Sequence, residues 1–275
     1  MNLKILLSFA MTFVRKIQRS TAWILPMGIL LFLLVLWEVL VRAGNVPAWQ
    51  LPTPSAILNE LIVSKGLLWS HTLVTLEEIG VGFSAALITG WTLAAGIAYS
   101  RILERSVYPI IIASQTIPII AIAPLLLIWV GYGLTPKVII VALICFYPIS
   151  VNIVDGLKSI DPDMVNMFRT LGASRFQVFT KLQIPNSLPF MFSGIKIGIS
   201  VSVIAAVIGE WVGGSEGLGY LITYSQPLFL TARVFAAIFL LSLMGIILFA
   251  LAVWIEHLTM PWYFNAKRIN SGEIL

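Results

Sequence analysis

Long apolar runs dominate the chain, and each is about as long as a helix that crosses a lipid bilayer. A helix rises about 1.5 Å per residue, so about 20 apolar residues cross ~30 Å of hydrocarbon. Such runs occupy residues 23–42, 79–99, 107–131, 136–155, 190–211 and 232–256. The short alternating segments of a membrane barrel are not seen. The pattern therefore predicts an all-α polytopic membrane protein with six transmembrane helices.

The composition agrees with a lipid environment. Hydrophobic residues make up 59% of the chain and charged residues 11%, whereas soluble domains carry about 25% charged residues. The mean hydropathy is +0.98. These values exclude a soluble enzyme, a disordered chain and a collagen-like repeat. The single cysteine, Cys145, excludes a disulfide framework.

The basic residues predict the orientation. With a cytoplasmic N-terminus, 12 of the 17 Lys and Arg residues lie inside and four lie outside, while Lys196 falls within the fifth span. This split follows the positive-inside rule. Both termini are then cytoplasmic, with a leader at 1–22, a membrane domain at 23–256 and a tail at 257–275. The net charge of +5 reflects this topology, so nucleic acid is not an expected partner.

Two longer connections are expected on the outer side. Residues 43–78 begin with several prolines, and the apolar spacing from Ser55 onward predicts an amphipathic surface helix. Glu77 and Glu78 are expected at the solvated rim of the second span. Residues 213–233 are rich in glycine yet apolar, which predicts a re-entrant or surface segment.

Small and polar residues within the spans indicate how the helices pack and where a path lies. Gly82, Ala86 and Gly90 form a stripe that allows a neighbouring helix to approach closely. Polar groups inside spans usually face a cavity. The candidates for a solute path are Ser114, Gln115, Tyr147 and Glu210.

Some of these positions have simpler interpretations. Pro118 and Pro124 predict a kink in the third span. Glu210 fits solvation at the rim as well as a place in the outer gate or on the solute path, and Lys196 fits snorkelling toward the inner face.

The inner segment 156–188 is long and polar in an otherwise apolar chain. Asp161 is a candidate N-cap with Pro162 at the first helical position, and Gly172 is a candidate C-cap after Leu171. Ser174 and Gln177 have the form of a capping box that starts a second helix. We expect that helix to end before Pro185. The segment is therefore predicted to be a helical hairpin that bends at Gly172.

This hairpin has the composition of an interface. Phe168, Leu171, Phe176 and Phe179 are apolar, and Arg169, Arg175 and Lys181 are charged. An apolar centre with a polar rim is typical of a protein–protein contact. The alternative is that the hairpin packs on its own membrane domain.

At this segment the chain resembles the inner-membrane permease subunits of ATP-binding-cassette (ABC) importers. Their cytoplasmic motif reads Glu-Ala-Ala, three residues, Gly, nine residues, then Ile-x-Leu-Pro. Gly172 and Pro185 match its Gly and Pro, and Leu182 and Ile184 stand at its two aliphatic positions. Residues 166–168 read Asn-Met-Phe and depart from Glu-Ala-Ala.

The resemblance extends over nearly the whole chain to the nitrate, sulfonate and taurine branch of these permeases. It is carried by Leu51-Pro-Thr-Pro-Ser55, Ile117-Pro118 with Pro124-Leu125, Leu171-Gly-Ala-Ser-Arg175 and Gly217-Leu-Gly-Tyr220. The runs 114–121 and 207–211 look most like permeases for thiamine-precursor pyrimidines and riboflavin. Nitrate, taurine and aliphatic sulfonates are the alternative solutes.

The resemblance implies a type I ABC importer permease fold in a bacterial inner (plasma) membrane, with lipid around it. It implies two ATPase subunits, a periplasmic or lipid-anchored solute-binding protein and a second permease copy, hence a homodimer. Segment 156–188 would be the coupling element that contacts the ATPase. The coupling residues would be Phe168, Arg169, Leu171, Gly172, Ala173, Ser174, Arg175, Phe176 and Pro185.

The chain shows no sequence signature of its own catalysis. No G-x-x-x-x-G-K-[ST] phosphate loop occurs. His71, His257 and Cys145 are far apart, so no metal, cofactor or catalytic residue is expected. ATP hydrolysis is therefore expected in a partner ATPase. The alternative classes are a stand-alone secondary carrier or channel, which would often show inverted repeats, and an intramembrane enzyme.

Overall fold

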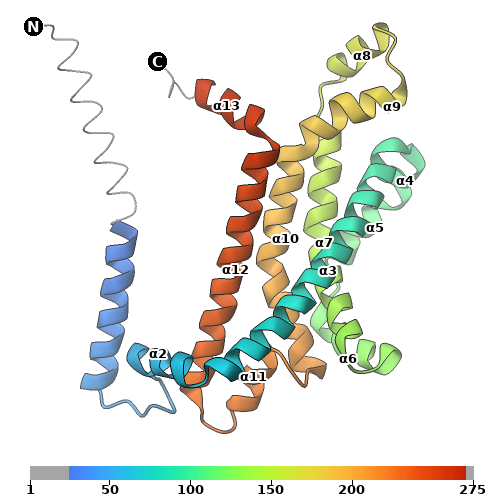
Figure 1. The fold of residues 1–275 in the computed structure, drawn as a ribbon. Coiled ribbons are helices and arrows are strands. Elements are labelled where there is room, and N and C mark those ends of the chain that lie inside the picture. The colour runs from blue at the N-terminus through green and yellow to red at the C-terminus, as the bar shows by residue number, and fades with distance from the viewer. Residues whose placement is uncertain (1–24, 271–275) are drawn as a thin grey trace, which may run out of the picture. The chain divides into compact units, whose positions relative to one another are not determined.

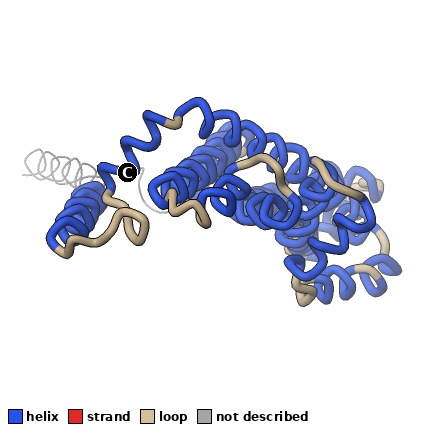
Figure 2. The backbone as a smooth tube through the Cα atoms, turned by 90° about the horizontal axis from the view of Figure 1, so that it is seen from below, coloured by secondary structure: helices blue, strands red, loops and turns tan. Residues whose placement is uncertain are grey.

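The computed structural model describes residues 25–270, which are almost entirely helical (Figure 1). Figure 2 shows no strand among these residues, so the predicted all-α fold is confirmed. The predicted leader, 1–22, lies outside the described residues. The chain divides into two compact units, one of residues up to 65 with 225–236, and one of residues 66–224 with those from 237 onward.

The first unit contains the predicted surface helix. A helix at Leu25–Ala43 forms the first span, and α2 follows at Pro54–Val63 with Thr53 as its N-cap. The Glu38 carboxylate accepts hydrogen bonds from the Ser55 amide at 3.0 Å and the Ser55 hydroxyl at 2.8 Å. These bonds tie the start of α2 to the first span.

The second unit holds most of the membrane helices. The long helices of the chain are α3 (Lys65–Tyr99), α7 (Leu134–Lys158), α10 (Ile184–Gly213) and α12 (Thr231–Thr259). With Leu25–Ala43, they make five described helices that are long and apolar enough to cross a membrane. The shorter helices are α4 (Arg101–Ser106), α5 (Tyr108–Ser114), α6 (Ile119–Val130), α8 (Pro162–Thr170), α9 (Arg175–Val178), α11 (Leu218–Ser225) and α13 (Pro261–Asn270).

The predicted third span is broken. Arg101–Ser114 and Ile119–Val130 meet at 99°, a much sharper bend than the predicted kink. Pro118 has extended backbone angles and stands as the N-cap of α6, and a residue before proline avoids the helical region. The Ser114 and Thr116 hydroxyls bond to backbone carbonyls of the turn before them. The described residues thus contain up to six helices long and apolar enough to cross a membrane when the broken pair counts as one.

Glycines bring α3 and α10 close to α7. A Cβ at Gly82 would lie 2.6 Å from the Val141 Cβ, and one at Gly194 would lie 2.9 Å from the Pro148 carbonyl oxygen. Within a membrane such close contact is a main source of helix association. The packing stripe predicted on α3 is therefore confirmed, and α7 packs against both helices.

The two ends of the second unit carry different elements. Figure 1 shows α4, α8 and α9 at one end and α11 at the other. The segment 156–188, which contains α8 and α9, therefore shares an end of this unit with α4.

Candidate functional site

A cavity of about 570 Å³ lies where the broken third span meets α7 and α10. Its polar lining consists of Ser114, Gln115, Tyr147 and Asn152, and aliphatic and aromatic side chains make up the rest. Among the described residues that line it, none carries a charge.

Two breaks in helical regularity place these polar groups. The break after Ser114 ends α5 and leaves Gln115 exposed beside the cavity. In α7, Pro148 follows Tyr147, and the Asn152 amide donates to the Pro148 carbonyl at 2.7 Å. The remaining Asn152 oxygen, the Gln115 amide and the Tyr147 hydroxyl provide donors and acceptors in an apolar setting.

Three of the four predicted path residues thus lie together. Ser114, Gln115 and Tyr147 line one cavity, although they come from two elements. Asn152 joins them and was not among the candidates. The spacing along α7 could have identified Asn152 as a further lining residue. It lies four residues after Pro148 and five after Tyr147, and residues four apart share a helix face.

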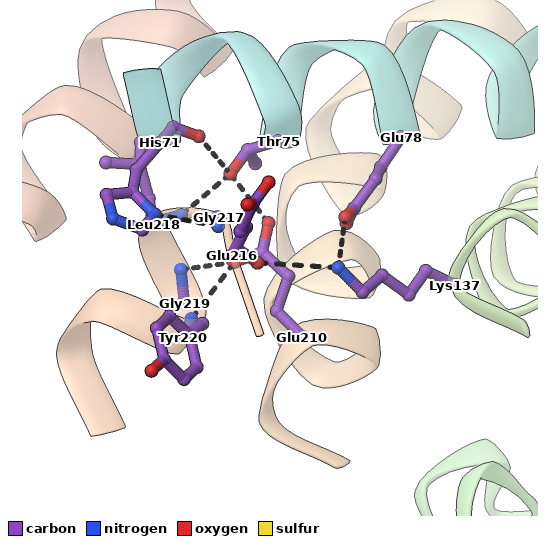
Figure 3. A network of polar contacts seen from close by, with 10 residues as sticks. All are labelled: His71, Thr75, Glu78, Lys137, Glu210, Glu216, Gly217, Leu218, Gly219 and Tyr220. Atoms are coloured by element: carbon purple, nitrogen blue, oxygen red, sulfur yellow. Dashed lines mark hydrogen bonds and ion pairs between the residues drawn. The ribbon is translucent and has the colours of Figure 1, made fainter. Parts of the chain in front are cut away.

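Glu210 does not line the cavity. Its side chain is 1% exposed, so solvation at the rim is the wrong interpretation. Figure 3 shows the carboxylate among groups from three helices. It accepts a 2.6 Å hydrogen bond from the Thr75 hydroxyl of α3, and bonds from the backbone N–H groups of Gly219 and Tyr220.

The start of α11 is capped entirely by side chains from other helices (Figure 3). The Leu218 N–H donates to the Thr75 hydroxyl at 2.8 Å, and the Gly217 N–H donates to His71 Nδ1 at 2.9 Å. We call this arrangement the carboxylate clasp. It comprises His71, Thr75, Glu210 and the N–H groups of residues 217–220. A carboxylate at a helix N-terminus also meets the positive end of the helix dipole.

The glycines of the Gly217-Leu-Gly-Tyr220 run permit the clasp. Gly217 has φ +108°, and a Cβ there would overlap the Glu210 carboxyl group. A Cβ at Gly219 would lie 2.8 Å from a carboxylate oxygen of Glu210. Larger residues would therefore push the carboxylate away from the N–H groups that it binds.

Two further charged groups predicted near solvent are instead paired. Glu78 is fully buried and accepts a 2.6 Å ion-pair contact from the Lys137 ammonium of α7, so its predicted place at a solvated rim is wrong. The same ammonium lies 3.4 Å from the Glu216 carbonyl. Lys196 of α10 is also paired. It binds both carboxylate oxygens of Glu256 on α12, at 3.0 and 2.7 Å.

The segment 156–188 forms the predicted bent hairpin. Asp161 caps α8, and Ser174 with Gln177 forms a complete capping box at the start of α9. Gly172 has φ +83°, a conformation that favours glycine. The prediction that the second helix ends before Pro185 is wrong. A π turn at Phe179–Gln183 leads directly into α10.

The tip of the hairpin presents apolar side chains. Leu171 is 77% exposed and Phe176 is 71% exposed. These two side chains therefore do not pack on the membrane domain in this structure. Arg169, Ser174 and Arg175 are exposed beside them, and Phe168 and Ala173 are half-buried.

Comparison with known proteins identifies related sequences and folds. Residues 82–260 match the family of binding-protein-dependent transport system inner membrane components. A formylaminopyrimidine transport permease protein of Halalkalibacterium halodurans is 39% identical over 89% of this chain and 98% of its own length. A riboflavin transport system permease protein of Chloroflexus aurantiacus is 40% identical over 90% of this chain and 94% of its own length.

Relatives of lower identity are named for other solutes. A putative aliphatic sulfonates transport permease protein of Bacillus subtilis is 26% identical over 89% of this chain and 90% of its own. An inward-facing structure of the methionine ABC transporter MetNI has a similar fold. Its TM-score is 0.62 with 19% identity, covering 70% of this chain and 96% of that one.

Proposed function

Because the chain belongs to the family of binding-protein-dependent transport system inner membrane components, it is the multi-pass inner-membrane permease of an ABC importer, and we propose that it carries a neutral pyrimidine- or flavin-type solute. In such an importer a partner ATPase hydrolyses ATP, and a solute-binding protein supplies the solute. We further propose that the solute passes the cavity at Ser114, Gln115, Tyr147 and Asn152.

The lining of the cavity supports a neutral solute. An anion without a positive partner is disfavoured in an apolar site, and the described lining is uncharged. Amide and hydroxyl groups suit the ring nitrogens and carbonyls of pyrimidines and flavins. The 39% and 40% identities to permeases named for such solutes support the same choice. Sulfonates, taurine and nitrate are the alternative, supported by relatives at 26–27% identity.

The hairpin at 156–188 is proposed to bind the ATPase. Its exposed Leu171 and Phe176, with Arg169 and Arg175 beside them, have the apolar centre and charged rim of a protein interface. The proposed contact comprises Phe168, Arg169, Leu171, Gly172, Ala173, Ser174, Arg175 and Phe176, with Pro185 at the start of α10.

The assembly is proposed to contain two permease copies and two ATPase subunits, with a periplasmic or lipid-anchored binding protein. Both termini and residues 156–188 are proposed to be cytoplasmic. The unequal distribution of Lys and Arg supports this orientation.

Uptake into vesicles tests the solute and the path. The permease is reconstituted with its ATPase and binding protein, and formylaminopyrimidine, riboflavin and taurine are offered separately. We expect ATP-dependent uptake of one of the first two. Gln115→Leu should reduce it about tenfold through loss of one hydrogen bond and desolvation of the solute group. Ile112→Leu is the control, because Ile112 is an exposed residue on α5 outside the cavity lining. Uptake of taurine alone, a solute with both a sulfonate and an ammonium group, would contradict the proposed pyrimidine- or flavin-type solute, and unchanged uptake by Gln115→Leu would contradict the path.

A further inference from the structure

A short helix, α13, follows the last membrane-crossing helix. α12 ends at Thr259 and α13 begins at Pro261, with Met260 alone between them. The match to the permease family stops at residue 260, so α13 lies beyond the matched residues. Figure 1 shows α13 turned to one side of the α12 axis. A residue before proline avoids the helical region, which explains why the chain bends at Met260.

Charged residues place this bend at the level of the lipid headgroups. On α12, the 22 residues between Arg233 and Glu256 carry no charge. They span about 33 Å as helix, which is close to the ~30 Å of hydrocarbon in a bilayer. Glu256, which is paired with Lys196, therefore marks one edge of the hydrocarbon. Pro261 lies about 7–8 Å further along the helix, and the headgroup layer is about 5–8 Å thick on each side.

Two aromatic side chains at the start of α13 face outward. Phe264 stacks on His257 of α12, with 3.9 Å between the ring centroids, whereas Trp262 is 54% exposed and Tyr263 is 40% exposed. Trp and Tyr gather at the edge of a bilayer, because the apolar ring and the polar N–H or O–H then each meet a suitable medium. Trp262 and Tyr263 thus have the chemistry of residues that lie among headgroups.

The exposed surface of α13 continues an apolar stripe of α12. Trp254 and Leu258 are exposed on the last turns of α12, and residues four apart share a helix face. Trp262 follows Leu258 by another four residues. Exposed apolar side chains near the end of a membrane-crossing helix are solvated by lipid. Trp262 therefore extends a surface that already meets lipid.

The charge of this segment favours anionic lipid. Residues 261–270 include two basic residues, Lys267 and Arg268, and no acidic residue. Basic residues beside a membrane-crossing helix attract anionic headgroups, and salt screens this attraction. Trp and Tyr insert into neutral and anionic bilayers alike, so a preference for anionic lipid comes from the basic pair.

We propose that α13 is an in-plane membrane anchor that binds anionic lipid. Trp262 and Tyr263 lie at the depth of the headgroups, and the positive charge of the segment draws anionic headgroups to it. The segment 257–275, expected as a cytoplasmic tail, then contains a membrane-bound helix. Through the ion pair of Glu256 with Lys196, the anchor also holds the depth of α10. The inference goes beyond the proposed function, because it requires neither the solute nor the ATPase.

Fluorescence quenching by lipid tests the anchor. Trp262→Cys is made in a Cys145→Ser background, labelled with a nitrobenzoxadiazole fluorophore, and placed in phosphatidylcholine vesicles with a nitroxide quencher near the headgroup end of the acyl chains. The label should lose about half or more of its fluorescence, because it lies at the depth of the quencher. Leu171→Cys is the control, since Leu171 is exposed at the tip of the hairpin, and its label should keep its fluorescence. Where Trp262→Cys fails to assemble, Tyr263→Cys is measured in the same way.

Nitroxide-labelled phosphatidylglycerol, compared with nitroxide-labelled phosphatidylcholine at equal mole fraction, tests the lipid preference. The anionic lipid should associate with the Trp262→Cys label about fivefold or more tightly, the effect of one basic residue near a membrane surface. Adding Lys267→Gln with Arg268→Gln should remove this preference. Arg101→Gln with Arg105→Gln is the matched control, because both arginines are exposed on α4, and it should keep the preference.

Each part of the proposal has its own contrary result. A Trp262→Cys label that is quenched no more than the Leu171→Cys label overturns the anchor. If its fluorescence changes only when the ATPase is added, α13 binds the ATPase and the anchor is also overturned. Equal association of the two lipids, or a preference that survives Lys267→Gln with Arg268→Gln, overturns the binding of anionic lipid. These measurements need no solute uptake, so they distinguish failure of the anchor from failure of the proposed function.

Discussion

Glu78 and Lys137 show how one residue determines the environment of another in this bundle. Both side chains are removed from water, and their 2.6 Å contact joins α3 to α7. Removing one partner of such a pair leaves an uncompensated charge, which costs about 3–5 kcal/mol. Replacing both partners by uncharged side chains of similar volume is often neutral or stabilising.

Lys137→Met should therefore lower the stability of the purified permease by about 3 kcal/mol or more, because Glu78 is left unpaired in an apolar environment. The double variant Lys137→Met with Glu78→Gln should recover most of this loss. Lys65→Met is the control, since Lys65 is exposed and should stay within about 0.5 kcal/mol. Thermal and denaturant unfolding in detergent measure these differences. Equal stability of the Lys137 and Lys65 variants would contradict the importance of the pair.

The sequence alone does not predict that Glu78 contacts Lys137. Lys137 lies 59 residues from Glu78, and Thr75 lies 135 residues from Glu210. Hydropathy identifies polar residues near the end of a span but does not show which helix faces them. The same holds for Lys196 and Glu256, 60 residues apart. By contrast, the caps at Asp161 and Ser174 are local, because all their partners lie within three residues. Local spacing was enough to predict them.

The α3–α7 contact illustrates packing at the scale of elements. Two glycines on α3 that are only two residues apart have opposite surroundings. A Cβ at Gly82 would press on Val141, whereas a Cβ at Gly80 would have no atom within 4 Å. Gly82 thus permits the close approach of α7, and Gly80 does not contribute to it.

Gly82→Ala should destabilise the permease by about 1–3 kcal/mol, because the added methyl group forces α3 away from α7. Gly80→Ala should be neutral or stabilise by up to about 1 kcal/mol, since alanine favours helix more than glycine does. Unfolding of the two variants in detergent provides the comparison. A larger loss in Gly80→Ala than in Gly82→Ala would contradict this packing.

The elements differ in how well the sequence predicts them. The spans at α7, α10 and α12 follow from apolar length alone. The break before α6 is only half predicted, because Pro118 indicates a kink but the 99° angle depends on the helices packed around it. The continuation of the helix through Pro185 was missed. A proline in the first turn of α10 needs no backbone donor there, so the helix tolerates it.

At the scale of the whole molecule, the hairpin and the cavity are separate parts of one transport subunit. Gly172→Val should strain the bend by roughly 1 kcal/mol or more. Phe176→Asp should remove an apolar anchor worth about 2 kcal/mol of binding, which is roughly thirtyfold in affinity. Both variants should insert normally, and then lose the ATPase on purification or hydrolyse ATP without uptake. ATPase retention and uptake, measured on the same membranes, test this expectation.

Ile102→Asp is the control for this experiment, since Ile102 is 78% exposed on α4, at the same end of the unit but outside the hairpin. It should retain the ATPase and transport. If both Gly172→Val and Phe176→Asp retain the ATPase and take up solute normally, the proposed coupling role of residues 156–188 is contradicted.

The unbroken helical run from Arg175 to Gly213 also restricts how the gene can change. Each inserted or deleted residue would turn everything beyond it by about 100° around the helix axis, since one turn takes 3.6 residues. Glu210 would then point away from α3, whatever residues surrounded it. Length changes are thus excluded between these positions, apart from the wider π turn at Phe179–Gln183, where one more residue fits into a turn. Homologues should vary in length instead at the irregular connections near 44–53 and 226–230.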